Sequence, residues 1–487
     1  MDRFSAPTSQ FLVAFVRALC TSRVAPAGVV LLLVLLPILF VSRGENSEWN
    51  NCYVVAARHM AAHETIHGPG AYYAYPPCMA WLAVPLALRP LPISLFLWSL
   101  VNVAAVITSF VCCWRLMNGP KLTKLAAPWI AVYWLGFALS LRWVVSSLEH
   151  QQFDTVITAL LLAGCWAIAQ GRDLRAGLLI GLAASMKCTP LLFVPYLAWR
   201  GRFRAALVVL AATVVFNLLP DVCFPKAEGG LYVTDWWRQF VVGLKNSAPG
   251  DWHTSIQLNQ SVGGFFNRLL GIHRFGIAAD LTFVPFDLAD KRLIKLLTYG
   301  TDALLLLVTL CIARRPFTAP APLPIESTQS PALSVRQMSG QAVHPLWGVE
   351  FGALLALMLL LSPMSGKAHY VALWLPTLLI ARHCLDRPTR FRVGLVVFLL
   401  ITGTLTSKGF TGRTLGDLTL TLGLPTLNAL ATLVGMWELH VALRRRAPTA
   451  VAPGDCAAVP APLGRFIRSR AANPKQFGNH SRVGRTK

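Results

Sequence analysis

Apolar stretches recur along the chain, and short polar or basic segments separate them. The first stretch runs from Val24 to Val41. The others occupy about 92–114, 125–147, 153–170, 205–219, 294–313, 346–361, 369–381, 391–407 and 418–443. About 20 predominantly apolar residues are needed to cross roughly 30 Å of hydrocarbon as a helix. The pattern therefore predicts an all-α fold, a polytopic transmembrane helical bundle.

Two apolar segments do not read as single spans. Residues 176–199 have basic residues on both sides, so both flanks should face the cytoplasm. This segment should then leave and return as a hairpin of two short helices that turns at Lys187-Cys188-Thr189-Pro190. Residues 76–90 are too short to span and contain Pro85, which favours an interfacial or re-entrant helix on the outer surface. The prediction is about 12 membrane segments, two of them short, with a long first outer loop.

The charge of the chain follows the same topology. In 487 residues, 44 Lys and Arg stand against 21 Asp and Glu, which gives a formal net charge of +23. A nucleic-acid partner is not expected, because the basic residues are scattered and form no folded basic domain. They gather instead on the segments that the pattern places in the cytoplasm. We therefore expect a multi-pass protein in contact with the lipids of the cell (plasma) membrane, with both termini cytoplasmic.

The polar residues outside the stretches are concentrated in two long outer loops, and this concentration suggests a domain organisation. The predicted parts are a cytoplasmic N-terminus 1–23, a membrane core 24–300 with outer loops 43–91 and 220–293, C-terminal transmembrane helices 301–443 with a cytoplasmic loop 314–345, and a basic tail 444–487. Composition predicts disorder for that cytoplasmic loop and for the tail. Chemistry is expected on the extracytoplasmic face.

A few charged residues are candidates for chemistry. Glu48 lies just beyond the first stretch, where partial desolvation would make its carboxylate a usable base; the alternative is a solvated loop acid. Lys187, at the tip of the predicted hairpin, is costly to bury, so it should bind an anion, pair with Asp154 or reach the interface. Arg268 and His369 are weaker candidates for the same anion; each could equally be an interfacial anchor or a satisfied residue at a helix end.

Motifs for nucleotides and metals do not occur in the sequence. It contains no H-E-x-x-H, P-loop or G-x-G-x-x-G pattern, and no cluster of metal-ligating residues stands out. An activated substrate should therefore come in a form other than a nucleotide. We expect no cofactor; a divalent cation is possible but is not indicated.

Six separated motifs together resemble a known family. They are Glu48-Trp49-Asn50-Asn51 followed by Ala56-Ala57-Arg58, Tyr75-Pro76-Pro77, Gln152-Phe153-Asp154, Lys187-Cys188-Thr189-Pro190, Asn259-Gln260-Ser261 with Arg268, and Ser362-Pro363 with His369-Tyr370. Their order and spacing resemble glycosyltransferase family 87, integral-membrane enzymes of the type C superfamily that include polyprenyl-phosphate-mannose-dependent mannosyltransferases. The resemblance covers about residues 25–380. Glu48 stands where the family typically has Asp, and Gln152-Phe153-Asp154 where Gln-x-Asn is more usual.

The resemblance implies a hexosyltransferase that moves a hexose, in the first place mannose, from a polyprenyl-phosphate-linked donor to a lipid or glycan acceptor on the outer face, with inversion. It implies Glu48 as the catalytic base, with Asp154 in reserve, and Lys187, Arg268 and His369 as ligands of the donor phosphate. The substrate pocket would be formed by Trp49, Asn51, Tyr75, Gln152, Asp154, Asn259 and Gln260. Trp236, Trp237 and Trp252 are candidates for sugar stacking or for the aromatic belt. The main alternative is a transporter or flippase of lipid-linked sugars.

Overall fold

The computed structural model describes residues 24–68, 73–120, 127–242, 256–270, 275–278, 281–283, 291–314 and 343–445. The described residues up to Arg444 belong to one unit. Four predicted features lie outside the described residues: the N-terminus 1–23, most of the loop 314–345, the tail beyond Arg445, and Trp252. The predictions of disorder and of cytoplasmic location for those segments therefore stay predictions.

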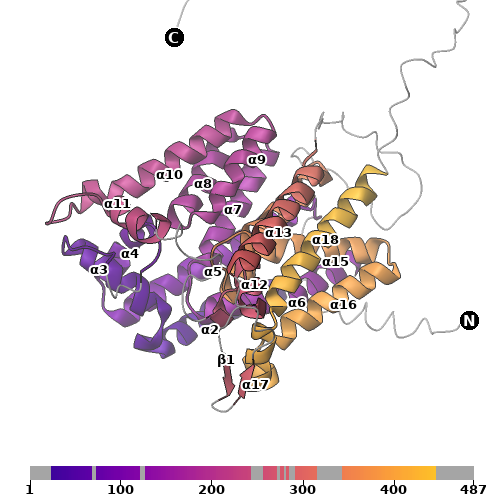
Figure 1. Cartoon of the computed structure of the whole chain (residues 1–487), viewed down its shortest axis with the longest axis horizontal. Coiled ribbons are helices and arrows are strands. Elements are labelled where there is room, and N and C mark those ends of the chain that lie inside the picture. The colour runs from indigo at the N-terminus through magenta and orange to yellow at the C-terminus, as the bar shows by residue number, and fades with distance from the viewer. Residues whose placement is uncertain are drawn as a thin grey trace, which may run out of the picture. The chain divides into compact units, whose positions relative to one another are not determined.

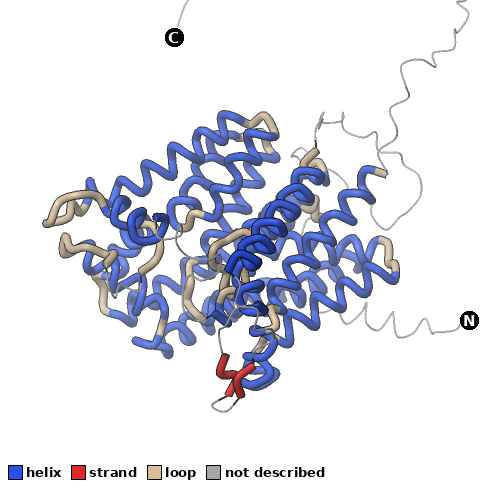
Figure 2. Tube along the Cα trace, in the orientation of Figure 1, coloured by secondary structure: helices blue, strands red, loops and turns tan. Residues whose placement is uncertain are grey.

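The described part of the chain is helical almost throughout, as Figure 2 shows. Its main helices, labelled in Figure 1 where there is room, are α2 (Val24–Arg43), α3 (Val55–Ala61), α4 (Pro77–Ala87), α5 (Leu91–Leu116), α6 (Ala127–Glu149), α7 (Asp154–Ala169), α8 (Asp173–Met186), α9 (Phe193–Trp199), α10 (Phe203–Cys223), α11 (Tyr232–Trp236), α12 (Val262–Leu270), α13 (Lys291–Ile312), α14 (Pro345–Leu360), α15 (Trp374–Asp386), α16 (Arg390–Leu405), α17 (Lys408–Thr421) and α18 (Leu424–Arg444). Short 3-10 or π-helical turns also occur, among them Trp49–Val54, Thr189–Leu192, Ile256–Leu258 and Lys367–Leu373.

Several of these helices can cross a membrane. By length and composition, five described helices qualify: Leu91–Leu116, Pro128–Glu149, Phe203–Cys223, Arg292–Ile312 and Leu424–Arg444. A sixth span results if α16 and α17 count as one broken span. Four shorter apolar helices, such as α7 and α14, accompany them. The chain is thus a helical, multi-pass membrane protein in its described part, and the total of about 12 segments stays a prediction.

The hairpin predicted within residues 176–199 is present. Helix α8 ends at Met186, because Lys187 has extended backbone angles (φ −156°, ψ 124°) and Pro190 follows. The chain then returns through Thr189–Leu192 and α9. An ion pair of 3.2 Å between Asp173 and Arg202 joins the start of α8 to the start of α10, so both basic flanks lie at one end and Lys187 at the other. Figure 1 shows α8 alongside α10, and the two helices pack against each other.

Three features of the described chain differ from the predicted pattern. The stretch 418–443 is two helices, because Gly423 has a positive φ of 74° that ends α17 and starts α18 on a new axis. Helix α17 itself was not predicted, since the sequence there is rich in Gly, Thr and charged residues; it is bent by 91° from α16. A small antiparallel hairpin of β1 (Phe275–Ala278) and β2 (Leu281–Phe283) belongs to the segment 220–293, predicted as the second outer loop, and lies beside α17.

Candidate active site

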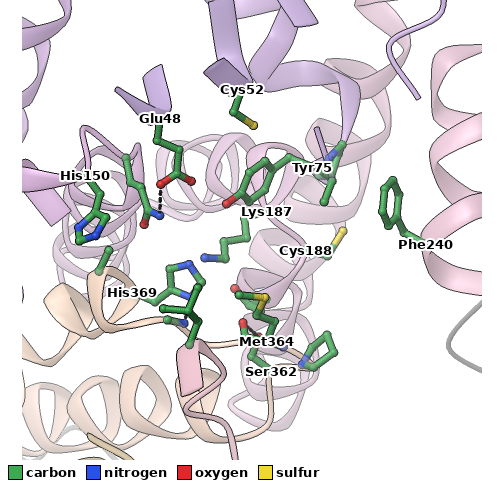
Figure 3. Close-up of a pocket in the computed structure, with 18 of the residues that line it drawn as sticks. Glu48, Cys52, Tyr75, His150, Lys187, Cys188, Phe240, Ser362, Met364 and His369 are labelled. Carbon is green, nitrogen blue, oxygen red and sulfur yellow. Dashed lines mark hydrogen bonds between the residues drawn. The ribbon is translucent and has the colours of Figure 1, made fainter. Parts of the chain in front are cut away.

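A cavity of about 1220 Å³ opens among segments that are far apart in the sequence (Figure 3). Its walls come from the π-helical turn after α2, the loop before α4, the end of α6, the turn at Lys187 and the chain between α14 and α15. The polar residues on its surface include Glu48, Asn51, Tyr75, Ser146, His150, Gln152, Lys187, Thr189, Ser362, Lys367 and His369. Six of these are site residues that the sequence indicated from five separate motifs, and the other five were not indicated or were only neighbours within a motif.

The tryptophan that follows Glu48 anchors this acid at the cavity. Trp49 is buried, stacks on Trp98 with ring centroids 4.1 Å apart, and donates its indole N–H to the hydroxyl of Ser94 at 2.9 Å. Its ring therefore points into the protein and away from the cavity lining. The structure shows Trp49 in an anchoring role, which holds the half-buried Glu48 at the edge of the cavity, and its predicted contact with substrate stays a prediction.

The carboxyl group of Glu48 has a pKa near neutral pH. Gln152 donates its amide N–H to Oε2 of Glu48 at 2.6 Å. Burial raises the pKa of Glu48 to about 7; the hydrogen bond from Gln152 and the charge of Lys187 oppose this rise, while the charge of Asp154 adds to it. A carboxylate with such a pKa inside a cavity suits a general base at physiological pH.

Asp154 lies behind the cavity and holds two of its lining residues. Its Oδ1 pairs with Nζ of Lys187 at 2.9 Å, and its Oδ2 lies 3.7 Å from Nε2 of His369. The backbone N–H of Gly366 donates to Nδ1 of His369 at 2.9 Å, so the ring proton is on Nε2 and faces Asp154. Asp154 is the first residue of α7, where the helix dipole stabilises a negative charge. The structure thus shows the pairing of Lys187 with Asp154 that was one alternative for this lysine.

Arg268 does not reach the cavity. Its buried guanidinium donates to the backbone carbonyls of Thr421 at 3.1 Å and of Asn259, and to the side-chain oxygen of Gln260 at 3.3 Å. The prediction that Arg268 binds the donor phosphate is therefore not supported by its position, because these acceptors and not the cavity surround it. An arginine in a motif gives no indication of whether it faces a ligand or a backbone carbonyl.

Asn259 and Gln260 support the cavity wall from behind. The Asn259 amide donates to the carbonyl of Pro363 at 2.9 Å and accepts the N–H of Ser365 at 3.2 Å. The backbone N–H of Gln260 donates to the carbonyl of Ser365 at 2.6 Å. Both predicted pocket residues thus position the segment around Pro363, which lines the cavity, and neither lines the cavity itself.

Some of the aromatic and basic residues line the cavity and others do not. Trp236 lines the cavity and donates its indole N–H to the carbonyl of Ala74 at 3.1 Å, whereas Trp237 is 55% exposed and does not line it. Lys367 and His150 line the cavity and were not predicted. Each lies two residues from a predicted site residue, and that proximity is the only signal of them in the sequence.

Metal-ligating side chains do not gather anywhere in the described part of the chain. No group of three or more His, Cys, Asp or Glu side chains that could hold a metal ion occurs among the described residues. That the reaction needs no cofactor stays a prediction.

Comparisons with known proteins match this chain to one family. The model of glycosyltransferase family 87 matches residues 73–321, which include Gln152, Asp154 and Lys187 but neither Glu48 nor Lys367. A polyprenol-phosphate-mannose-dependent alpha-(1-2)-phosphatidylinositol pentamannoside mannosyltransferase of Mycobacterium tuberculosis is 30% identical over 249 residues, 48% of this chain and 53% of that protein.

Two further proteins are similar. A polyprenol-phosphate-mannose-dependent alpha-(1-2)-phosphatidylinositol mannoside mannosyltransferase of Mycolicibacterium smegmatis is 30% identical over 208 residues, 41% of this chain and 43% of that protein. The chain thus spans about half the length of the curated relatives it matches. The crystal structure of ArnT from Cupriavidus metallidurans, bound to undecaprenyl phosphate, covers 84% of this chain and 78% of its own at 12% identity, and its TM-score of 0.35 is too low to assign the fold.

Proposed function

This chain belongs to glycosyltransferase family 87, and from that premise we propose that it transfers a hexose from a polyprenyl-phosphate-linked donor to a lipid or glycan acceptor. Mannose is the proposed sugar, because the names of the relatives specify polyprenol-phosphate-mannose. The proposed site of reaction is the extracytoplasmic face of the plasma membrane, in a bundle of about 12 membrane segments with both termini cytoplasmic.

The orientation is supported by the end of the α8–α9 hairpin at which the cavity lies. Lys187 lines the cavity at one end of this hairpin. The basic flanks around Asp173 and Arg202 meet at the opposite end. Short loops rich in Lys and Arg stay in the cytoplasm, so the cavity belongs to the outer side.

The observation that carries the proposal is the carboxyl group of Glu48, with a pKa of about 7, at the edge of a large cavity. In the proposed reaction, Glu48 accepts the proton of an acceptor hydroxyl. The freed oxygen attacks the anomeric carbon from the face opposite the phosphate, a new C–O bond forms, and the bond to the phosphate oxygen breaks with its electron pair. Polyprenyl phosphate leaves, and the configuration at the anomeric carbon inverts.

The neighbours of Glu48 maintain this base. Gln152, through its hydrogen bond of 2.6 Å, orients the carboxylate and stabilises its charged form. Lys187 favours the same form by its positive charge. Asp154 holds Lys187 and faces His369, so it acts as a positioning residue and keeps the ammonium in place. In this arrangement Asp154 is already engaged as an ion-pair partner, which leaves Glu48 as the base.

The proposal is tested by the transfer activity of the purified full chain. Glu48→Gln keeps the size of the side chain and its hydrogen-bonding capacity but cannot accept a proton. We expect transfer from polyprenyl-phosphate-mannose to fall by about 10²–10⁴-fold, the usual contribution of a general base. Glu48→Asp, which restores the residue typical of the family, should retain part of the activity. Thermal unfolding in detergent verifies that each variant is folded, and wild-type transfer by Glu48→Gln would remove Glu48 from the mechanism.

A further inference from the structure

The cavity is lined by two lysines, and they differ in what surrounds them. Lys187 pairs with Asp154 at 2.9 Å and faces Glu48. The side chain of Lys367, two residues before His369, lines the cavity and forms no hydrogen bond or ion pair with any of the described residues. Its side chain is half-buried, so its charge has neither a protein partner within the described segments nor full hydration.

The groups that face Lys367 carry an excess of positive charge. They are the cations Arg142 and Lys408 and the carboxylates Glu149 and Asp417. Both carboxylates are already engaged, Glu149 with Arg43 at 3.2 Å and with Arg142 at 3.8 Å, and Asp417 with Lys408 at 2.5 Å. Counting Lys367 and Arg43, four cations stand against two carboxylates. Neither carboxylate is left to neutralise Lys367, so its ammonium group, which lines the cavity, attracts an anion there.

The surroundings of Lys187 have no such excess of positive charge. Lys187 is one cation against the carboxylate of Asp154 and that of Glu48 in its ionised form. The ring of His369 accepts a hydrogen bond from Gly366 on Nδ1, which fits its neutral form. An anion placed beside Lys187 would meet no uncompensated cation, and it would be repelled by the base in the form that catalysis requires.

The geometry of an inverting transfer gives the two lysines different roles. The attacking oxygen, the anomeric carbon and the departing phosphate oxygen lie roughly in line, so the base and the phosphate occupy opposite sides of the sugar. Lys187 is linked to the base through two contacts, because its partner Asp154, 2.9 Å away, lies two residues after Gln152, whose amide donates to Glu48. Lys187 is thus held beside the base, whereas the ammonium group of Lys367 has no partner among the described residues and is available to an anion in the cavity.

We propose that Lys367 binds the phosphate group of the polyprenyl donor, and that Lys187 is a positioning residue for Glu48. This inference rests on the proposed function, because it assigns the phosphate of that donor. Burial and the neighbouring Arg142 and Lys408 lower the pKa of Lys367 to about 8, as expected for an ammonium group that lacks a counter-ion. A bound phosphate supplies that counter-ion, as a charge-assisted acceptor.

The test measures binding and needs no transfer. Purified full chain in detergent is titrated with polyprenyl phosphate and, separately, with uncharged polyprenol of the same length. We expect Lys367→Gln to weaken the binding of polyprenyl phosphate by about tenfold or more and to leave the binding of polyprenol unchanged. Lys367→Arg, which keeps the charge, should retain the preference for the phosphate. Arg89→Gln, which removes an exposed cation outside the cavity lining, should affect neither lipid.

Several outcomes would overturn the inference. One is wild-type binding of polyprenyl phosphate by Lys367→Gln, and another is a larger phosphate-specific loss in Lys187→Gln than in Lys367→Gln. A third is an effect of Lys367→Gln on a phosphate-bearing acceptor alone, which would assign Lys367 to the acceptor. If no sugar is transferred but the preference for phosphate depends on Lys367, the proposed function fails and the phosphate site stands.

Discussion

The hydrogen bond between Gln152 and Glu48 leads to a prediction about the pH dependence of transfer. Gln152→Leu removes the amide N–H that lies 2.6 Å from Oε2 of Glu48 and keeps a side chain of similar size. This hydrogen bond stabilises the charged carboxylate, so its loss raises the pKa of Glu48 above its present value of about 7. The acid limb of the activity profile should therefore move to higher pH.

The size of this effect follows from the strength of the bond. A hydrogen bond to a charged group contributes about 1.5–3 kcal/mol, and about 1.4 kcal/mol corresponds to one pH unit. Because Glu48 is only half-buried, solvent screening favours the lower end, a rise in its pKa of about one unit. At pH 7 the ionised fraction then falls from about one half to about one tenth. Activity should be about fivefold lower at pH 7 and close to wild type above pH 9.

The assay is kcat/KM for transfer measured from pH 5.5 to pH 9.5, since this ratio reports the pKa of the free enzyme. Wild type should gain activity as the pH rises through about 7, where Glu48 loses its proton. Ser146→Ala, another change in the cavity lining, serves as the matched control and should leave the limb in place. An unmoved limb in Gln152→Leu, or a loss of activity that is equal at every pH, would refute the assignment of that limb to Glu48.

Two further variants test the positioning roles by their effect on stability. Arg268→Met should lower the free energy of unfolding in detergent by about 3 kcal/mol. Buried carbonyls, including those of Asn259 and Thr421, lose their hydrogen-bond donor, at about 1–3 kcal/mol each. Weaker binding of the sugar donor at an unchanged melting temperature would contradict this role. Asp154→Asn should lower the free energy of unfolding by about 3–5 kcal/mol, because it leaves the Lys187 ammonium group without its partner. In the double variant Asp154→Asn with Lys187→Met, the loss of stability should be smaller than the sum of the losses in the two single variants. Strict additivity would argue against an interaction between Asp154 and Lys187.

Hydropathy is sufficient to predict most of the helices. The apolar stretch predicted at 92–114 is the helix Leu91–Leu116, and the one at 205–219 is Phe203–Cys223. Long apolar helices follow from composition alone, since each satisfies its own backbone hydrogen bonds and presents apolar side chains to lipid. The break at Gly423 and the 91° bend before α17 are different, because they depend on local backbone angles and on packing against other segments.

The candidate site was only partly accessible from the sequence. Motif order pointed to Glu48, Gln152 and Lys187, and the fold brings these residues into one cavity. The choice among the alternatives for Lys187 was not accessible, since Asp154 and Lys187 are 33 residues apart and meet only through the packing of α7 and α8. The sequence indicated Lys367 only by its position two residues before His369, because the lack of a partner for its side chain among the described residues is a property of the folded chain.

The most direct measurement is the choice of donor by the purified wild-type chain. The protein is reconstituted into liposomes and given an acceptor lipid with mannose labelled either on polyprenyl phosphate or on a nucleotide diphosphate. We predict that the label passes to the acceptor from the lipid-linked donor alone, with release of polyprenyl phosphate and an anomeric configuration opposite to that of the donor. Transfer from the nucleotide donor, retention of configuration, or binding of the lipid donor without any transfer would contradict the proposed function.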